Sequence, residues 1–131
     1  MKTSLSLRSE ISRAKNLGSS GHGSHHWIMQ RISAVMLIPL FLWGIYYVIS
    51  ISRMSKEEIL QSLILPYNSS CLLLLMISAL YHSALGMQVV IEDYINSICI
   101  RKILIVGLKI FTATTIFFLT FAVMYFVLRK G

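Results

Sequence analysis

Three long apolar runs dominate this 131-residue sequence and occupy about residues 27–51, 66–91 and 104–128. A helix rises about 1.5 Å per residue, and roughly 20 residues cross the hydrocarbon core of a bilayer, so each run is long enough to span a membrane once. Because lipid offers backbone groups no hydrogen bonds, separate spans of this kind must be helical. The sequence predicts an all-α integral membrane protein whose three transmembrane helices form one anchor domain over residues 27–131.

The overall composition supports the same class of protein. Hydrophobic residues make up 56% of the chain and charged residues 13%, and the mean hydropathy is +0.72, values outside the range of soluble domains. The net charge of +7 comes mostly from residues outside the apolar runs, and no basic patch is interleaved with aromatic residues. The charge is therefore expected to orient the chain in a lipid bilayer, and no nucleic acid is predicted as a partner.

Residues 1–26 form a polar, basic amino-terminal arm. No apolar segment precedes Trp27, so we do not expect a cleavable secretory signal. A basic, serine-containing and acid-poor start is also typical of organelle transit peptides, but a surface arm with a short amphipathic piece is favoured. Within the first span, Pro39 predicts a kink or close packing against a neighbour, and residues 53–58 predict a short charged loop.

The basic residues also predict the orientation of the spans, because lysine and arginine are held on the cytoplasmic side during insertion. One group lies in the arm, at the start of the first span and in the second loop: Lys2, Arg8, Arg13, Lys15, Arg31, Arg101 and Lys102. A smaller group lies in the first loop and at the end of the chain: Arg53, Lys56, Arg129 and Lys130. We therefore expect the amino terminus inside and the carboxyl terminus outside.

His82 is an ionisable side chain deep within the second span. Such a group is costly in hydrocarbon unless it is paired, and by default it marks a working site. A neutral imidazole there can ligate a haem iron, relay a proton or hydrogen-bond to a neighbouring helix, and the histidine alone does not choose among these roles. Gly86, one turn away on the same face, clears space for a flat macrocycle or for a close helix.

The remaining histidines and the cysteines limit what this chain can supply by itself. His22, His25 and His26 fall at or before the start of the first span, too near the surface to reach an iron held by His82. A bound haem would therefore need its other axial ligand from a second subunit or a second copy. Cys71 and Cys99 form no metal-binding motif, and on one continuous helix they would lie on the order of 40 Å apart, which excludes a disulfide between them.

The second span ends in Asp93 and Tyr94, a carboxylate and a phenol placed where the apolar helix meets water. A quinone needs lipid access for its tail and a hydrogen-bond donor for its carbonyl head, so a boundary tyrosine suits it. Tyrosines at this depth are also ordinary aromatic-belt anchors. Arg31, at the start of the first span, could face a haem propionate or the quinone mouth, or could be a snorkelling surface charge.

Two parts of the sequence together resemble a known family. They are His26-Trp27-Ile28-Met29-Gln30-Arg31-Ile32-Ser33-Ala34-Val35 in the first span, and His82-Ser83-Ala84-Leu85-Gly86-Met87 with Glu92-Asp93-Tyr94 in the second. The histidine is followed four residues on by glycine and twelve on by the tyrosine of an Asp-Tyr pair. With the arginine of the first span, this pattern is similar to the D-type hydrophobic membrane anchor subunit of succinate dehydrogenase, respiratory complex II.

The resemblance implies a role for each candidate residue. His82 would be one axial ligand to the iron of a b-type haem shared with a cytochrome b partner subunit, and Tyr94 would hydrogen-bond the head of ubiquinone or another quinone. Asp93 would support Tyr94, and Arg31 would lie near the haem propionates and the quinone pocket. A flavoprotein subunit would oxidise succinate and an iron–sulfur subunit would pass the electrons on, so this chain would be a non-catalytic subunit.

Two other functions stay open from the residues. The anchor of a fumarate reductase would run the same chemistry backward, and a small transporter or proton-relay subunit would use His82 as its titrating group. We expect a multi-pass protein of the bacterial inner (cytoplasmic) membrane, with the mitochondrial inner membrane less favoured. The resemblance gives no role to the amino-terminal arm, to Gln88 or to Glu92.

Overall fold

The structure is a computed structural model that describes residues 21–130, so most of the predicted amino-terminal arm lies outside the described residues. The described part is helical, with elements α2 (Gly21–Ile51), α3 (Lys56–Ile64), α4 (Pro66–Tyr94) and α5 (Ile98–Lys130), and no strand occurs in it. By length and composition, three helices can cross a membrane: Trp27–Ile51, Pro66–Tyr94 and Ile98–Arg129. The predicted all-α class and the three predicted spans are confirmed.

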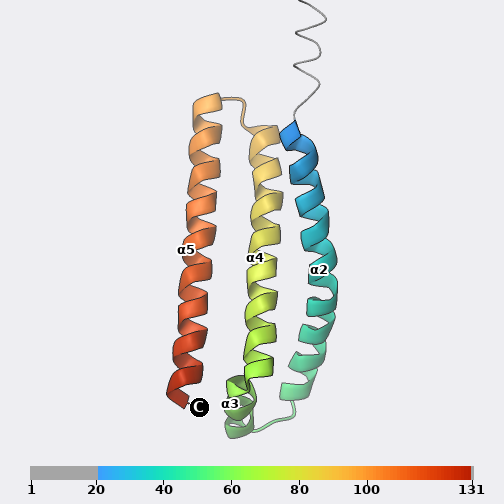
Figure 1. Ribbon diagram of the computed structural model, residues 1–131, viewed down its shortest axis with the longest axis vertical. Coiled ribbons are helices and arrows are strands. Elements are labelled where there is room, and N and C mark those ends of the chain that lie inside the picture. The colour runs from blue at the N-terminus through green and yellow to red at the C-terminus, as the bar shows by residue number, and fades with distance from the viewer. Residues whose placement is uncertain (1–20, 131) are drawn as a thin grey trace, which may run out of the picture.

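The three long helices lie side by side in a row, with α4 between α2 and α5 (Figure 1). α4 packs along both neighbours, whereas α2 and α5 form no comparable interface. Very few of the described residues are buried, namely Ser33, Gly44, Tyr47 and Ser69. The chain therefore has almost no core of its own, and broad apolar faces of every span are left for lipid or for a partner helix.

The start of α2 and the turn between α4 and α5 lie at one end of the row, whereas α3 and the end of α5 lie at the other (Figure 1). The members of the two basic groups that the structure describes are thus separated along the helices, with Arg31, Arg101 and Lys102 toward one end and Arg53, Lys56 and Arg129 toward the other, as the sequence predicts. Which end faces the cytoplasm stays a prediction. α2 continues as a helix through the exposed Pro39 and bows along its length.

The prediction of a charged loop over residues 53–58 is wrong at its second half, because α3 begins at Lys56. The Ser55 backbone N–H donates to Glu58 Oε2 at 2.7 Å, and the Glu58 N–H donates to Ser55 Oγ at 3.4 Å, which is a capping box. The N–H of Ser55, and then its hydroxyl, lower the pKa of the Glu58 carboxyl. The box satisfies free amides at the start of α3 and so starts a helix where charge alone indicated a loop.

The third span also begins earlier than the predicted residue 104. α5 starts at Ile98 after a connection of only three residues, so Arg101 and Lys102 lie in its first two turns rather than in a loop. Long basic side chains tolerate this position because their stems lie along the helix while the charges reach water. Cys71 and Cys99 accordingly lie on two different helices, α4 and α5, and both are free.

An aromatic and polar cluster joins α2, α3 and α4 at the end of the row that carries α3. The Trp43 ring stacks on Tyr47 with centroids 5.1 Å apart, and Tyr67 meets Trp43 edge-on at 6.3 Å. The Tyr47 hydroxyl lies 3.1 Å from Ser62 Oγ, and Asn68 Nδ2 donates to Ser62 Oγ at 3.0 Å. Because Tyr47 is only 6% exposed, this cluster fixes α3 against the two spans that it connects.

Gly44 lies at a close contact between α2 and α4. A Cβ atom built on Gly44 would lie 2.8 Å from Leu75 Cδ2, so a larger side chain would displace the Leu75 side chain or move the helices apart. Small residues at such contacts allow membrane helices to pack by van der Waals contact, which is a main source of their association in lipid.

We expect Gly44→Leu to destabilise the packing of α2 on α4 by roughly 1–3 kcal/mol, the usual cost of overpacking. Gly107→Leu on α5 is the matched control, because no atom lies within 4 Å of the added Cβ there. Denaturation of the lipid-reconstituted protein, followed by circular dichroism, measures the difference. Equal midpoints for the two variants would contradict the assigned α2–α4 contact.

Candidate functional site

His82 lies near the middle of α4 and turns toward α2, where its Nδ1 atom is 2.9 Å from the hydroxyl oxygen of Ser33. Ser33 is only 7% exposed, so the bond is formed away from water. The Ser33 hydroxyl also donates to the backbone carbonyl of Gln30, one turn earlier in α2, at 2.9 Å. The histidine predicted from the sequence is therefore paired across two helices.

The two contacts of Ser33 can both be hydrogen bonds at the same time in only one tautomer of His82. The Gln30 carbonyl can only accept, so the single hydroxyl hydrogen of Ser33 is used there. Toward His82 the hydroxyl can then only accept, so both bonds form together when Nδ1 is the protonated nitrogen. A neutral imidazole held in this way carries its lone pair on Nε2, the form required of a metal ligand.

A shallow apolar groove lies beside this histidine. It has a volume of about 350 Å³ and is lined by His82 together with five side chains of α2: Ala34, Leu37, Ile38, Phe41 and Leu42. His82 is the one titratable group of this lining. At Gly86, one turn along α4, no atom of another described element lies within 4 Å of the position that a Cβ would take, so no other helix among residues 21–130 fills the space beside it. The sequence predicts that Gly86 makes room either for a flat macrocycle or for a close helix. Because no described helix occupies this room, it is open to a group from outside the chain.

Asp93 and Tyr94 form the last turn of α4, as the sequence predicts. The Tyr94 side chain is 81% exposed and Asp93 is exposed as well. No hydrogen bond joins these two side chains, although both lie in the described part of the chain. The phenol is thus presented at the end of the span rather than buried in the chain's own packing.

Gln88 and Glu92, for which the sequence gives no role, bond to each other on the last turns of α4. Gln88 Nε2 donates to Glu92 Oε1 at 2.8 Å, an i to i+4 pair along one helix face. Arg101 of α5 reaches the backbone carbonyl of Glu92 at 3.5 Å. These contacts cap the end of α4 and hold the short turn that precedes α5.

Arg31 lies closer to His82 than to Tyr94. α2 and α4 run antiparallel, and the Ser33–His82 bond places those residues at one level (Figure 1). From that level Arg31 is two residues along α2, about 3 Å, while Tyr94 is twelve residues along α4, about 18 Å. The Arg31 guanidinium stacks over the Trp27 ring at 4.4 Å, and no ion pair joins it to Asp93 in the described residues. Arg31 therefore lies nearer the level of His82 than that of Tyr94, although it is exposed and no contact joins it to His82 in the described residues.

His25 lies in the first turns of α2 and is exposed, about 12 Å beyond the level of Ser33 at helical rise. The side chains of His22 and His26 lie outside those that the structure describes. Within the described residues, no three His, Cys, Asp or Glu side chains gather to hold a metal ion. A metal at His82 would therefore need ligands from outside the described chain.

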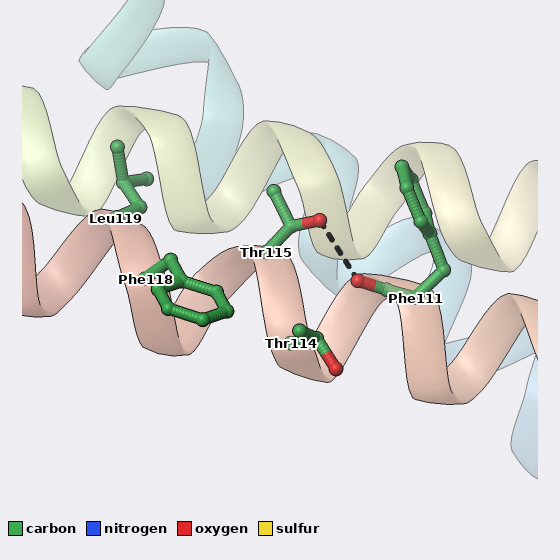
Figure 2. A pocket seen from close by; sticks show the side chains of 5 residues that line it. All are labelled: Phe111, Thr114, Thr115, Phe118 and Leu119. Atoms are coloured by element: carbon green, nitrogen blue, oxygen red, sulfur yellow. Dashed lines mark hydrogen bonds between the residues drawn. The ribbon is translucent and has the colours of Figure 1, made fainter.

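A second hollow lies on α5, with a volume of about 480 Å³. Figure 2 shows its lining, which consists of five side chains from α5: Phe111, Thr114, Thr115, Phe118 and Leu119. The Thr115 hydroxyl donates to the Phe111 carbonyl of its own helix at 2.8 Å. This hollow is larger than the groove at His82 but holds no titratable group, so it is a poorer candidate for chemistry.

The sequence does not identify Ser33 as part of the site. Its only signal is a serine inside an apolar run, and such a serine commonly bonds a carbonyl of its own helix, as Ser33 also does. The partner across the interface depends on the register of α2 against α4. That register is set by packing and is not written in either helix alone.

Known proteins similar to this chain indicate the family to which it belongs. The profile of the family described as succinate dehydrogenase/fumarate reductase transmembrane subunit matches residues 6–121. The succinate dehydrogenase hydrophobic membrane anchor subunit of Rickettsia bellii is 44% identical over 119 residues, which is 91% of this chain and 95% of that protein. The subunit of the same name from Rickettsia prowazekii is 40% identical with the same coverage.

A more distant relative is the succinate dehydrogenase membrane anchor subunit of Reclinomonas americana, which is 34% identical over 77 residues, or 56% of this chain and 64% of that protein. No solved structure matches the chain. The family resemblance drawn from the His82, Gly86, Asp93 and Tyr94 pattern is confirmed by the relatives that match nearly the full length. The chain is a multi-pass membrane protein that belongs to the family of succinate dehydrogenase membrane anchor subunits.

Proposed function

We propose that this chain anchors a succinate:quinone oxidoreductase in the membrane and contributes half of a b-type haem site and part of a quinone site. The observation that carries the proposal is the contact of His82 Nδ1 with Ser33, which leaves Nε2 without a hydrogen-bond partner among the described residues. An axial ligand to a haem iron needs such a free ring nitrogen.

The surroundings of His82 fit a haem. The imidazole lines an apolar groove, and none of the other described helices fills the space beside Gly86. A bound haem supplies one-electron redox chemistry. His82 would hold the iron through Nε2, and Arg31, at nearly the same level, would pair with a propionate rather than with the quinone mouth. The other axial ligand would come from the cytochrome b partner subunit.

The quinone site is assigned to the end of α4. Tyr94 is exposed at the boundary of the span, where a lipid-soluble quinone can bring its carbonyl head to a phenolic donor. The neighbouring Asp93 would support Tyr94, although the two side chains form no hydrogen bond with each other. The iron–sulfur subunit would approach this end of the row, and the flavoprotein subunit would lie beyond it.

The names of the relatives favour succinate oxidation over fumarate reduction, and the Rickettsia relatives favour a bacterial inner membrane. Ubiquinone is the quinone that we expect, although the recognition chemistry suits other quinones with the same carbonyl head. A proton-relay or transport role is less well supported, because a relay needs a succession of titratable groups. In the described residues, the hydrogen-bond partner of His82 is a serine whose own proton is already engaged.

The haem assignment is tested by His82→Leu, which removes one axial ligand and little volume. The assembled complex should lose its b-type haem or show a severely perturbed haem spectrum, while the three spans still insert. His25→Leu is the matched control, because His25 is an exposed histidine at the start of α2 and its loss should leave the spectrum unchanged. An unaltered haem spectrum in assembled His82→Leu would show that the ligand is another residue.

The quinone assignment is tested by Tyr94→Phe, which removes one hydrogen bond. A donor that strengthens as charge develops on the carbonyl oxygen contributes about 3 kcal/mol, so quinone reduction should fall on the order of 100-fold. Succinate oxidation by a water-soluble dye and the haem content should persist. Tyr81→Phe, another exposed tyrosine of α4, is the control and should affect neither rate. If the dye and quinone rates of Tyr94→Phe stay parallel to wild type, Tyr94 is an interfacial anchor only.

A further inference from the structure

The hydroxyl of Ser33 makes a contact outside its own helix. Its hydroxyl donates to the Gln30 carbonyl, and the same oxygen faces His82 Nδ1 on α4. Ser69 offers a comparison, because it is also buried but its hydroxyl contacts only the carbonyls of Leu65 and Pro66 in its own helix. Two serines are thus equally hidden, and the hydroxyl of Ser33 is the one that bonds an imidazole.

With the proton on Nδ1 of His82, the contacts form a directed chain of hydrogen bonds from His82 Nδ1–H to Ser33 Oγ–H and on to the Gln30 carbonyl. Each donor in such a chain polarises the next, so a hydroxyl that is already donating is a better acceptor. The chain fixes both the tautomer and the plane of the imidazole. Its middle member, Ser33, is only 7% exposed.

We infer that Ser33 is a positioning residue for His82, which holds the imidazole with Nε2 toward the iron and lowers the reduction potential of the haem. The inference rests on the proposed haem site and adds to it a residue whose role is electronic as well as structural. An acceptor on Nδ1–H raises the basicity of Nε2, and a more basic ligand favours the ferric state. Removing the acceptor should therefore shift the haem toward the ferrous state and raise its potential.

The size of the effect can be estimated from other metal sites. Loss of an outer-shell partner of a metal-binding histidine typically changes metal affinity or activity by about 10–100-fold. A hydroxyl is a weaker acceptor than a carboxylate, so the low end applies. A change of about tenfold in the ratio of ferric to ferrous haem corresponds to about 59 mV for a one-electron couple.

The test compares Ser33→Thr with Ser33→Val in the assembled complex, because these side chains have nearly the same shape and differ in the hydroxyl. Redox titration of the haem absorbance should give a midpoint potential near wild type for Ser33→Thr. For Ser33→Val it should be higher by up to about 59 mV, the tenfold change in the ratio. Ser69→Ala, which removes a buried hydroxyl that does not face His82, should leave the potential unchanged.

Equal potentials in Ser33→Val and Ser33→Thr, or a lower potential in Ser33→Val, would overturn the inference while the haem site itself stood. A wild-type complex without haem, or haem retained unchanged in His82→Leu, would instead overturn the proposed function and this inference with it. Ser33→Ala serves in the same comparison if the larger valine prevents assembly.

A second measurement does not depend on any Ser33 variant. Nitrogen-15 NMR of the histidine-labelled full chain, reconstituted in lipid without haem, reports which imidazole nitrogen carries the proton. The His82 signal, assigned by its loss in His82→Leu, should show a protonated Nδ1 and an unprotonated Nε2. A protonated Nε2 with a bare Nδ1 would contradict the role of Ser33.

Discussion

The hydrogen bond between His82 and Ser33 sets the arrangement of polar groups within the spans. A polar side chain in hydrocarbon must be paired, and this bond is satisfied at the rotation of α4 and the register against α2 that helix packing sets. Once the register is set, the level of Arg31 and the direction of the Gly86 face follow, and Tyr94 is carried to the far end of α4. The close contact at Gly44 holds the same two helices together farther along.

The row of helices explains why such a chain works as part of a complex. α4 is covered on two sides by α2 and α5, but the remaining faces of all three spans present large apolar side chains. Lipid satisfies such faces, yet a haem beside His82 needs a wall opposite the groove and a second ligand. A partner subunit packed against the α2–α4 face would provide both. The family to which the chain belongs is one of anchor subunits, and an incomplete site fits that family.

The spans and the polar residues within them can be predicted from the sequence, because long apolar runs with few charged residues are recognised without knowledge of the tertiary structure. The sequence also contains the capping box of α3, but the charged residues 53–58 are equally typical of a loop. The start of α5 at Ile98 could not be predicted for the same reason. Basic residues at a membrane surface, such as Arg101 and Lys102, are equally typical of loops and of helix ends. The role of Ser33 and the separation of Arg31 from Tyr94 could not be predicted, because both depend on the register between two helices.

An experimental structure of the assembled complex, at a resolution that shows the plane of the His82 imidazole, tests the central claim most directly. The account predicts a haem whose iron is bonded to Nε2 of His82, with Nδ1 still within hydrogen-bond distance of the Ser33 hydroxyl and the second axial ligand supplied by the partner subunit. An imidazole that faces lipid or a partner helix with no haem beside it, or an iron bonded through Nδ1, would contradict the account.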